Sequence, residues 1–283
     1  MSIENKTGTS KSFFYELTRG SAVGGVTIIF ATPLMNYLNF CNDRVNLNSG
    51  VNLTRFTFKR AFDGLPSYMS SVVPMIGVSL GTKKLLKDWT ERNKIKNSQN
   101  LDLVFSAFSG AIAGLVGVLP EGIAQAQQRS AIKPSAIKVL TQVVKQNGIT
   151  ALTRGASPTA VRQALFTLGF MSLMPMTAKY VNKEIQNKLI ADVCAAIIVG
   201  SIVGPATAPM NNLRFMRQQN FEKVGQATSY KEIFKKFSEG KGFFTGYKPR
   251  TFMTAISMFI LAKGSEITKG NLEDTTKKNK IRL

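Results

Sequence analysis

One arginine stands alone in a long stretch of sequence that carries no other charge. Between Arg154 and Lys179 the only Asp, Glu, Lys or Arg side chain is Arg162, and Gln163 follows it directly. A guanidinium holds a phosphate or a carboxylate through two parallel hydrogen bonds. Because a charge in apolar surroundings needs water, a partner or a ligand, Arg162 indicates anion binding. Arg250 is a second cationic candidate; for both arginines the alternative is a structural pairing with a helix end.

Most catalytic and metal-binding chemistry is excluded by what the chain lacks. Its 283 residues include no histidine, and its two cysteines, Cys41 and Cys194, lie 153 positions apart. A His-based triad, a His metal site and a CxxC site therefore cannot form. No P-loop, GxGxxG or GxSxG string stands between a strand and a helix. We expect no enzyme activity, no metal and no organic cofactor.

The chain is strongly basic, and its charges are unevenly distributed. Lys and Arg number 37 against 16 Asp and Glu, a formal net charge of +21, while 44% of the residues are hydrophobic. Such a balance fits a nucleic-acid surface, an anionic membrane or an anionic substrate. No charged residue occurs between Arg19 and Asp43, Asp63 and Lys83, Asp102 and Glu121, Asp192 and Arg214, or Arg250 and Lys263. This segregation is unlike a soluble nucleic-acid-binding protein, and we expect no nucleic-acid partner.

The length of these uncharged stretches predicts an all-α membrane protein. Most approach the ~20 apolar residues that a helix needs to cross a bilayer. We predict six transmembrane helices, at about 13–40, 65–87, 102–126, 156–182, 190–216 and 246–268. The alternative is a soluble helical protein, whose core would be too large for this length. Two basic amphipathic stretches, Ser135–Gln146 and Tyr230–Phe237, predict short interfacial helices.

An internal repeat organises the helices. Gly64, Gly155 and Gly246 stand in related loop strings and are 91 residues apart. Gly20, Gly24 and Pro33 have the same spacing as Ala196, Gly200 and Pro209. Small residues four apart let helices approach closely in lipid, and a proline nine positions later kinks the helix. We predict one domain over 1–283, with repeats at 13–97, 98–189 and 190–270 and a mobile polar tail at 271–283.

These features resemble the mitochondrial carrier family. Its three repeats each contain a kinked helix with a P-x-[DE]-x-x-[KR] motif and a following glutamine, a short matrix-side helix and a second membrane helix. The third repeat here reads Pro209-Met-Asn-Asn-Leu-Arg214-Phe-Met-Arg-Gln218, and Glu239–Arg250 is similar to the family's loop. The resemblance covers the whole chain. It implies a monomeric transporter in the mitochondrial inner membrane, whose motif charges form a gate on the matrix side.

The gate motif departs from the family pattern in every repeat. The acidic and basic positions are Met35 and Leu38 after Pro33, and Asn211 and Arg214 after Pro209. In the second repeat, Gly110 and Gly114 predict a kink at Ile123, whereas the proline is Pro120; the positions are then Gly122 and Gln125, or Gln125 and Gln128. Arg214 is the only charge left in this ring, which predicts a weakened gate. On the even helices, Lys83, Lys179 and Lys263 lack the acidic partners expected beside them.

The resemblance also implies a substrate site. Family contacts lie seven residues after each loop glycine, which gives Ser71, Arg162 and Met253, with Arg250 as a further contact. The Arg162-Gln163 pair resembles carriers of di- and tricarboxylates. The Lys-, Asn- and Ser-rich character of the chain instead resembles a nucleotide carrier that a bacterium secretes into host mitochondria, which implies ATP and ADP as substrates. A transport-inactive scaffold or receptor is a further alternative. The basic interfacial helices are candidates for binding cardiolipin, or carry generic surface charge.

Overall fold

The protein is all-helical. The computed structural model describes residues 4–46, 58–62, 65–96, 98–129, 135–218, 229–238, 242–244 and 246–281, and within them no strand occurs. The helices are α1 (Glu4–Asn46), α2 (Phe58–Ala61), α3 (Leu65–Arg92), α4 (Gln99–Arg129), α5 (Ala136–Asn147), α6 (Ala156–Leu168), α7 (Met174–Ile185), α8 (Lys188–Gln218), α9 (Tyr230–Ser238) and α10 (Tyr247–Ile281), with a 3-10 turn η1 (Ile149–Thr153) and a π-helical turn η2 (Gly169–Leu173). The predicted all-α fold class is confirmed.

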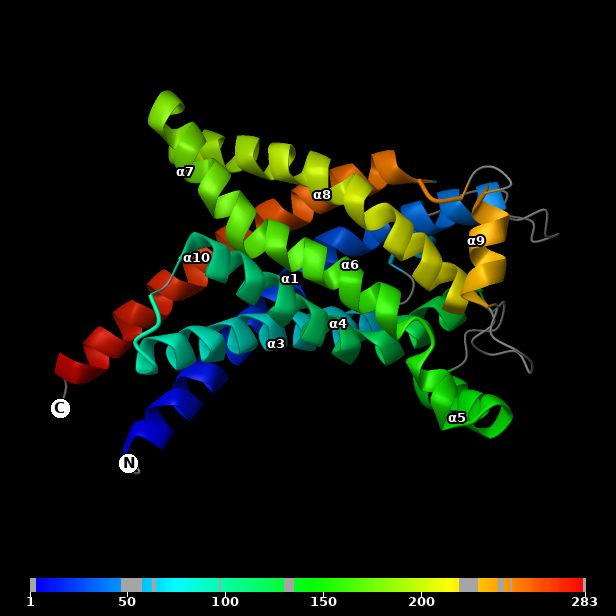
Figure 1. The fold of residues 1–283 in the computed structure, drawn as a ribbon, viewed down its shortest axis with the longest axis horizontal. Helices are drawn as coiled ribbons and strands as arrows, with labels where there is room; N and C mark the ends of the chain where they lie inside the picture. Colours follow the sequence, from blue (N-terminus) through cyan, green and yellow to red (C-terminus); the bar gives the residue numbers. More distant parts are fainter. Residues whose placement is uncertain are drawn as a thin grey trace.

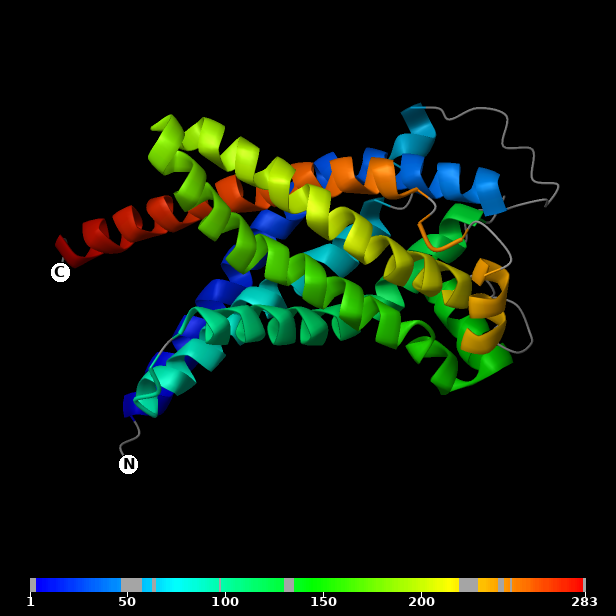
Figure 2. The same cartoon turned by 45° about the horizontal axis from the view of Figure 1, so that its top comes forward.

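Six long helical segments form a closed ring. They are α1, α3, α4, the continuous run α6–η2–α7, α8 and α10, and each contains one of the six helices predicted from the sequence. Neighbouring segments pack against one another in chain order, and α10 packs against α1 to close the ring. Figures 1 and 2 show that both termini lie at one end, with the α3–α4 and α7–α8 turns, whereas α5 and α9 lie at the other end. We call these the terminal end and the α5–α9 end.

By length and composition, two helices are able to cross a membrane: residues 99–127 of α4, and α8. Within the described residues the other four long segments do not meet this criterion, and in α3 several Ser, Gly and Lys residues dilute the apolar ones. More than half of the residues in the apolar window are not buried, in both α4 and α8. Helices therefore occupy the predicted ranges, while their crossing of a membrane, including that of α4 and α8, stays a prediction.

Glycine contacts join the two long helices of each repeat. A β-carbon added to Gly24 would lie 3.2 Å from the Val72 carbonyl oxygen, and one added to Gly110 would lie 2.6 Å from that of Gln163. One added to Gly200 would lie 2.7 Å from Cα of Ala255. The partner residues follow one another at steps of 91 and 92 residues, so the contact glycines (Gly24, Gly110 and Gly200) occupy corresponding places. Close backbone approach explains why these positions are glycine.

The predicted kink residues lie inside helices. Pro33 is within α1, Pro120 within α4 and Pro209 within α8, which also contains Pro205. Pro33 and Pro209 follow their contact glycine by nine residues and Pro120 follows by ten. The proline of the second repeat is therefore displaced by one residue, not by the three that the Gly114-based count gave.

The loops between the long helices also correspond. Gly155 and Gly246 have φ of 83° and 74° and directly precede α6 and α10. This left-handed backbone favours glycine. Gly64 lies outside the described residues. The two short helices predicted from the basic stretches are α5 and α9, and α5 buries Val139 and Val143 against Ile123 of α4. Helix α10 continues to Ile281, through the segment that was expected to be a mobile tail.

Candidate functional site: a buried arginine cluster

Four helices bring charged side chains together near the α5–α9 end. Glu121 comes from α4, Arg162 from α6, Arg214 from α8 and Arg250 from α10, and each is at most 8% exposed. We call these four residues the arginine cluster. The buried Tyr68 of α3 lies beside Arg162 and Arg214, so a fifth long helix borders the cluster.

A single carboxylate is shared between two arginines. Oε1 of Glu121 accepts a hydrogen bond from Nη2 of Arg162 at 2.7 Å, and Oε2 accepts one from Nη1 of Arg214. Nη2 of Arg214 also donates to Oδ1 of Asn211, at 3.1 Å. Charge-assisted bonds of this kind are about twice as strong as neutral ones. Glu121 therefore links α4 to both α6 and α8.

The third arginine of the cluster has no carboxylate partner among the described residues. Nε of Arg250 donates to the hydroxyl of Thr207 at 3.1 Å, and its charge is close enough to Arg162 and Arg214 to repel both. Three guanidinium groups and one carboxylate leave a buried excess of two positive charges. Because burying an uncompensated charge is strongly unfavourable, the excess points to anion binding.

Unpaired hydrogen-bonding atoms surround this excess charge. Within the part of the chain that the structure describes, Nε of Arg162 and of Arg214 and Oε1 of Gln125 and of Gln218 are buried without a hydrogen-bond partner. Buried polar atoms are normally satisfied by protein or water, and exceptions concentrate where a protein binds something. Two of these orphan atoms belong to guanidinium groups, which donate only. The cluster can therefore donate hydrogen bonds to further anionic oxygens.

Glu121 was missed by the sequence analysis. The sequence prediction that Arg214 is the only charge left in the ring was wrong, because Glu121 lies against it. The missed signal was the contact glycine. Eleven residues after Gly24, Gly110 and Gly200 stand Met35, Glu121 and Asn211, so Glu121 occupies the acidic position of the second repeat. Counting from Gly114 or Pro120 instead of Gly110 hid this correspondence.

Most of the other expected gate residues border the cluster or the helices that carry it. Asn211 binds Arg214 as described, and Gln125 is buried in α4. Met35 packs beside Ile28 and Tyr68. The side chains of Leu38 and Gln128 lie outside the described residues.

The remaining expected substrate contacts do not pair with the cluster. Ser71 is fully buried and its Oγ lies 3.5 Å from the Gly117 carbonyl oxygen. Met253 is half-buried on α10. Gln163 is buried with its β-carbon against Gly114, at the contact of α6 with α4. Of the expected substrate contacts, Arg162 and Arg250 are therefore the two that the fold brings together.

Gln218 fixes the loop beside the cluster. Its Nε2 donates to the backbone carbonyl oxygens of Val118 and Arg154, at 3.3 Å each. A β-carbon on Gly155 would contact Arg214 and Gln218 at 3.4 Å. Burial and the nearby charge of Arg217 lower the pKa of Arg154. Gln218 of α8 thus ties the loop ahead of α6 to α4 beside the arginines.

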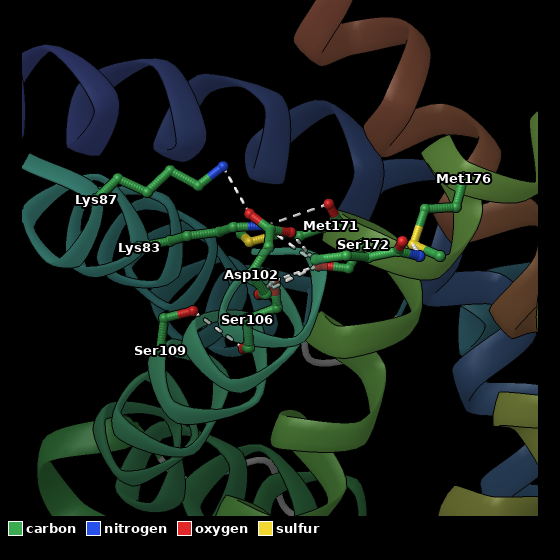
Figure 3. Close-up of polar contacts among 9 residues, drawn as sticks. Lys83, Lys87, Asp102, Ser106, Ser109, Met171, Ser172 and Met176 are labelled. Atoms are coloured by element: carbon green, nitrogen blue, oxygen red, sulfur yellow. Dashed lines mark hydrogen bonds and ion pairs between the residues drawn. The ribbon is translucent and has the colours of Figure 1, made fainter. Parts of the chain in front are cut away.

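A second polar network lies at the terminal end (Figure 3). Lys83 of α3 donates to Oδ2 of Asp102 on α4 at 2.8 Å, and Lys87 lies 2.6 Å from Oδ1. Ser172 of η2 donates to the same carboxylate at 2.6 Å, and its Oγ is 2.6 Å from that of Ser106. We call these five residues the terminal network. It joins α3, α4 and the π-helical turn.

The expectation that the lysines of the even helices lack acidic partners was wrong for two of them. Lys83 pairs with Asp102, and Lys263 of α10 lies 2.5 Å from Asp192 of α8. Lys179 is exposed. The prediction expected the acidic partners on the even helices, beside the lysines. The partners Asp102 and Asp192 instead stand near the starts of the odd helices α4 and α8. Glu16, Asp102 and Asp192 each precede their contact glycine by eight residues, which supports the threefold correspondence.

Comparison with known proteins adds no assignment. No model of a protein family matches this chain, and no curated protein sequence matches it. The resemblance to mitochondrial carriers therefore stays a prediction from motifs and spacing.

Proposed function

We propose that this protein is a membrane carrier of anionic metabolites, with adenine nucleotides as the leading substrates. The observation that carries the proposal is the arginine cluster: a buried excess of two positive charges, built from Glu121, Arg162, Arg214 and Arg250 on four helices. Anions with several charges, such as the phosphates of ATP and ADP, match this excess. Guanidinium groups suit phosphate because they offer two parallel donors.

The apolar surface of the helices supports placement in a membrane. Val104, Phe108 and Leu115 of α4, and Ile197 and Ile202 of α8, are all more than half exposed. Exposed apolar surface on this scale is unfavourable in water and natural in lipid. The placement in the inner mitochondrial membrane as a monomer follows from the family resemblance and belongs to the same proposal, and so does the placement in a host cell after bacterial secretion.

Two charged layers separate the ends of the ring. Along α4, Asp102 of the terminal network and Glu121 of the arginine cluster are 19 residues apart, about 28 Å at 1.5 Å per residue. A carrier that opens one end at a time needs a breakable closure near each end, and ion pairs between helices provide one. At the α5–α9 end a single carboxylate, with Asn211 and Met35 at the corresponding positions, makes this closure weaker than three ion pairs.

A second candidate is a di- or tricarboxylate carrier, because carboxylates suit the same guanidinium groups. Its sequence argument was the Arg162-Gln163 pair. Gln163 packs at Gly114, against α4, and this contact gives the glutamine a packing role. We therefore favour adenine nucleotides over di- and tricarboxylates as the substrates.

Uptake into liposomes tests the proposal. Purified protein is assayed with labelled ATP, and separately with citrate and malate, each with and without internal counter-substrate. We expect ATP uptake that ADP competes and citrate does not, and at least a tenfold loss in Arg162→Ala and Arg250→Ala, because each removes a guanidinium of the site. Lys138→Ala, on the exposed face of α5, is the control and should keep full uptake.

Three other outcomes separate the alternatives. Uptake of citrate or malate without ATP identifies a carboxylate carrier. Uptake that needs no counter-substrate supports the weakened closure. No uptake of any of the three, in protein shown to be folded, rejects the carrier proposal and favours a transport-inactive scaffold.

A further inference from the structure

We propose that Glu121 is a tethered competitor of the transported anion, which occupies Arg162 until a substrate displaces it and so sets the minimum charge of that substrate. The inference rests on the proposed function and assigns a specificity-determining role to a residue whose position in the family pattern is that of a gate residue. Glu121 is 2% exposed, and both of its oxygens are engaged by arginines of other helices.

The competition follows from the geometry at Arg162. The edge of a guanidinium formed by Nε and Nη2 offers the two parallel donors that grip a carboxylate or phosphate. In Arg162, Nη2 is held by Glu121, while Nε is buried without a partner among the described residues. One of the two donor atoms of this edge is therefore already bonded to the protein's own carboxylate. An anion that binds this edge with both donors must displace Oε1 of Glu121.

The charge balance decides which anions succeed. A monoanion that replaces Glu121 exchanges one negative charge for another and leaves a buried carboxylate with a weakened pairing, which is unfavourable. An anion with two or more charges also reaches Arg250, whose described partner is the neutral hydroxyl of Thr207. Such an anion then neutralises the positive charge of the cluster that Glu121 does not compensate. The cluster should therefore discriminate against monoanions.

Displacement also reaches the connection between helices. Glu121 bridges Arg162 of α6 and Arg214 of α8, so an anion on Arg162 leaves the carboxylate with Arg214 alone. Asn211 continues to hold Arg214 through Nη2. Anion binding thus loosens the α4–α6 link while Arg214 stays oriented for the return of Glu121.

Two variants separate competition from net charge. Glu121→Gln removes the competing charge. The double variant Glu121→Gln with Asn211→Asp keeps the net charge of the cluster but moves the carboxylate to a position beside Arg214, where Oδ1 already lies 3.1 Å from Nη2. It frees Arg162 without leaving Arg214 unpaired. Glu184→Gln, an exposed carboxylate of α7, is the matched control.

The experiment is calorimetric titration of each full-length protein in lipid nanodiscs with pyrophosphate and with acetate. We expect the parent protein to bind pyrophosphate and not acetate. The double variant should bind pyrophosphate at least tenfold more tightly and gain acetate binding, and Glu184→Gln should behave like the parent. If Glu121→Gln fails to fold, the double variant decides.

The outcomes distinguish this inference from the proposed function. Pyrophosphate binding of equal strength in the parent and the double variant overturns the competitor and leaves the anion carrier intact. Binding in the double variant but not in the parent supports the competitor and rejects transport, because the carboxylate then blocks the site. An absence of binding in every folded protein overturns both.

Discussion

At the scale of single residues, the arginine cluster lowers the stability of the fold while it favours the binding of an anion. Arg250 is buried close to two other guanidinium groups, and its described hydrogen bond is to a neutral hydroxyl. Like charges that share a buried site raise the free energy of the folded state. A group that is unfavourable for folding and lies beside unpaired donors is best explained by a ligand that compensates its charge.

Arg250→Met should therefore stabilise the protein while it impairs binding. Methionine has a comparable reach and removes the repulsion from Arg162 and Arg214. We expect a gain of about 1–2 kcal/mol in unfolding free energy, since replacing buried charge by apolar groups is often stabilising. Thermal unfolding in detergent measures the stability, and ATP uptake measures the function. A loss of stability would show that Arg250 has a structural role.

At the scale of helices, glycines set how closely the two long helices of a repeat approach. A β-carbon added to a contact glycine would lie only 2.6 to 3.2 Å from the nearest backbone atom of the partner helix. Not every glycine of these helices has this role. Gly25 follows Gly24 in α1, but an added β-carbon would meet only Val73 Cγ2, at 3.7 Å, which is ordinary packing distance.

Gly200→Ala and Gly25→Ala should change stability in opposite directions. The methyl group of Gly200→Ala meets Cα and N of Ala255 at 2.7 and 2.9 Å, so α8 and α10 must separate. We expect a loss of about 1–3 kcal/mol, as for overpacked cores. Gly25→Ala should gain up to about 1 kcal/mol from helix propensity. Unfolding curves of both variants check this, and equal effects would contradict the contact.

The terminal network makes a similar prediction for three elements at once. Asp102→Asn removes the negative charge beside the buried Lys83, whose other partners are the Met171 carbonyl and the Ser172 hydroxyl, each 3.3 Å away. Because the carboxylate is partly exposed, we expect a loss of about 2–3 kcal/mol, below that of a fully buried pair.

The control for the terminal network is Asp88→Asn. Asp88 pairs with Lys84 at 2.7 Å on the surface of α3, with an i,i+4 spacing. Such pairs contribute about 0.3–0.5 kcal/mol. A comparable loss in the two variants would mean that the network does not hold α3, α4 and η2 together.

At the scale of the whole molecule, the ring places both termini at one end and α5 with α9 at the other (Figure 1). Six membrane crossings require this arrangement, whereas crossings by α4 and α8 alone would put α9 on the side of the termini. The orientation of the loops relative to the membrane therefore tests the span prediction directly.

Tags at the two ends of the chain should be accessible from the same side of sealed, uniformly oriented proteoliposomes. In a variant whose Cys41 and Cys194 are replaced by serine, Lys231→Cys on the exposed face of α9 should react with an impermeant maleimide only from the opposite side. Termini on different sides, or Lys231→Cys on the same side as both, would rule out six crossings. Release of the protein by sodium carbonate would rule out integral insertion.

The local pattern of the sequence determined the helices, the repeat spacing and the three arginines of the cluster. Uncharged stretches, glycines four apart and the 91-residue step are patterns of residue type along the chain, so they can be found without a structure. The π-helical turn η2 and the run of α10 to Ile281 were not visible. No residue pattern in 169–173 announces the first, and polar composition alone suggested a tail where the second occurs.

Only the tertiary structure decided which charges meet. Arg162 was recognisable as a lone charge, but its partner Glu121 is 41 residues away on another helix, and Arg214 is 93 residues from Glu121. Asp102 and Asp192 appeared only as the ends of uncharged stretches until the ring placed them against Lys83 and Lys263. A charge's partner depends on helix rotation and on register between helices. Packing across the ring sets both, and a spacing count that starts one helical turn away assigns the wrong partner.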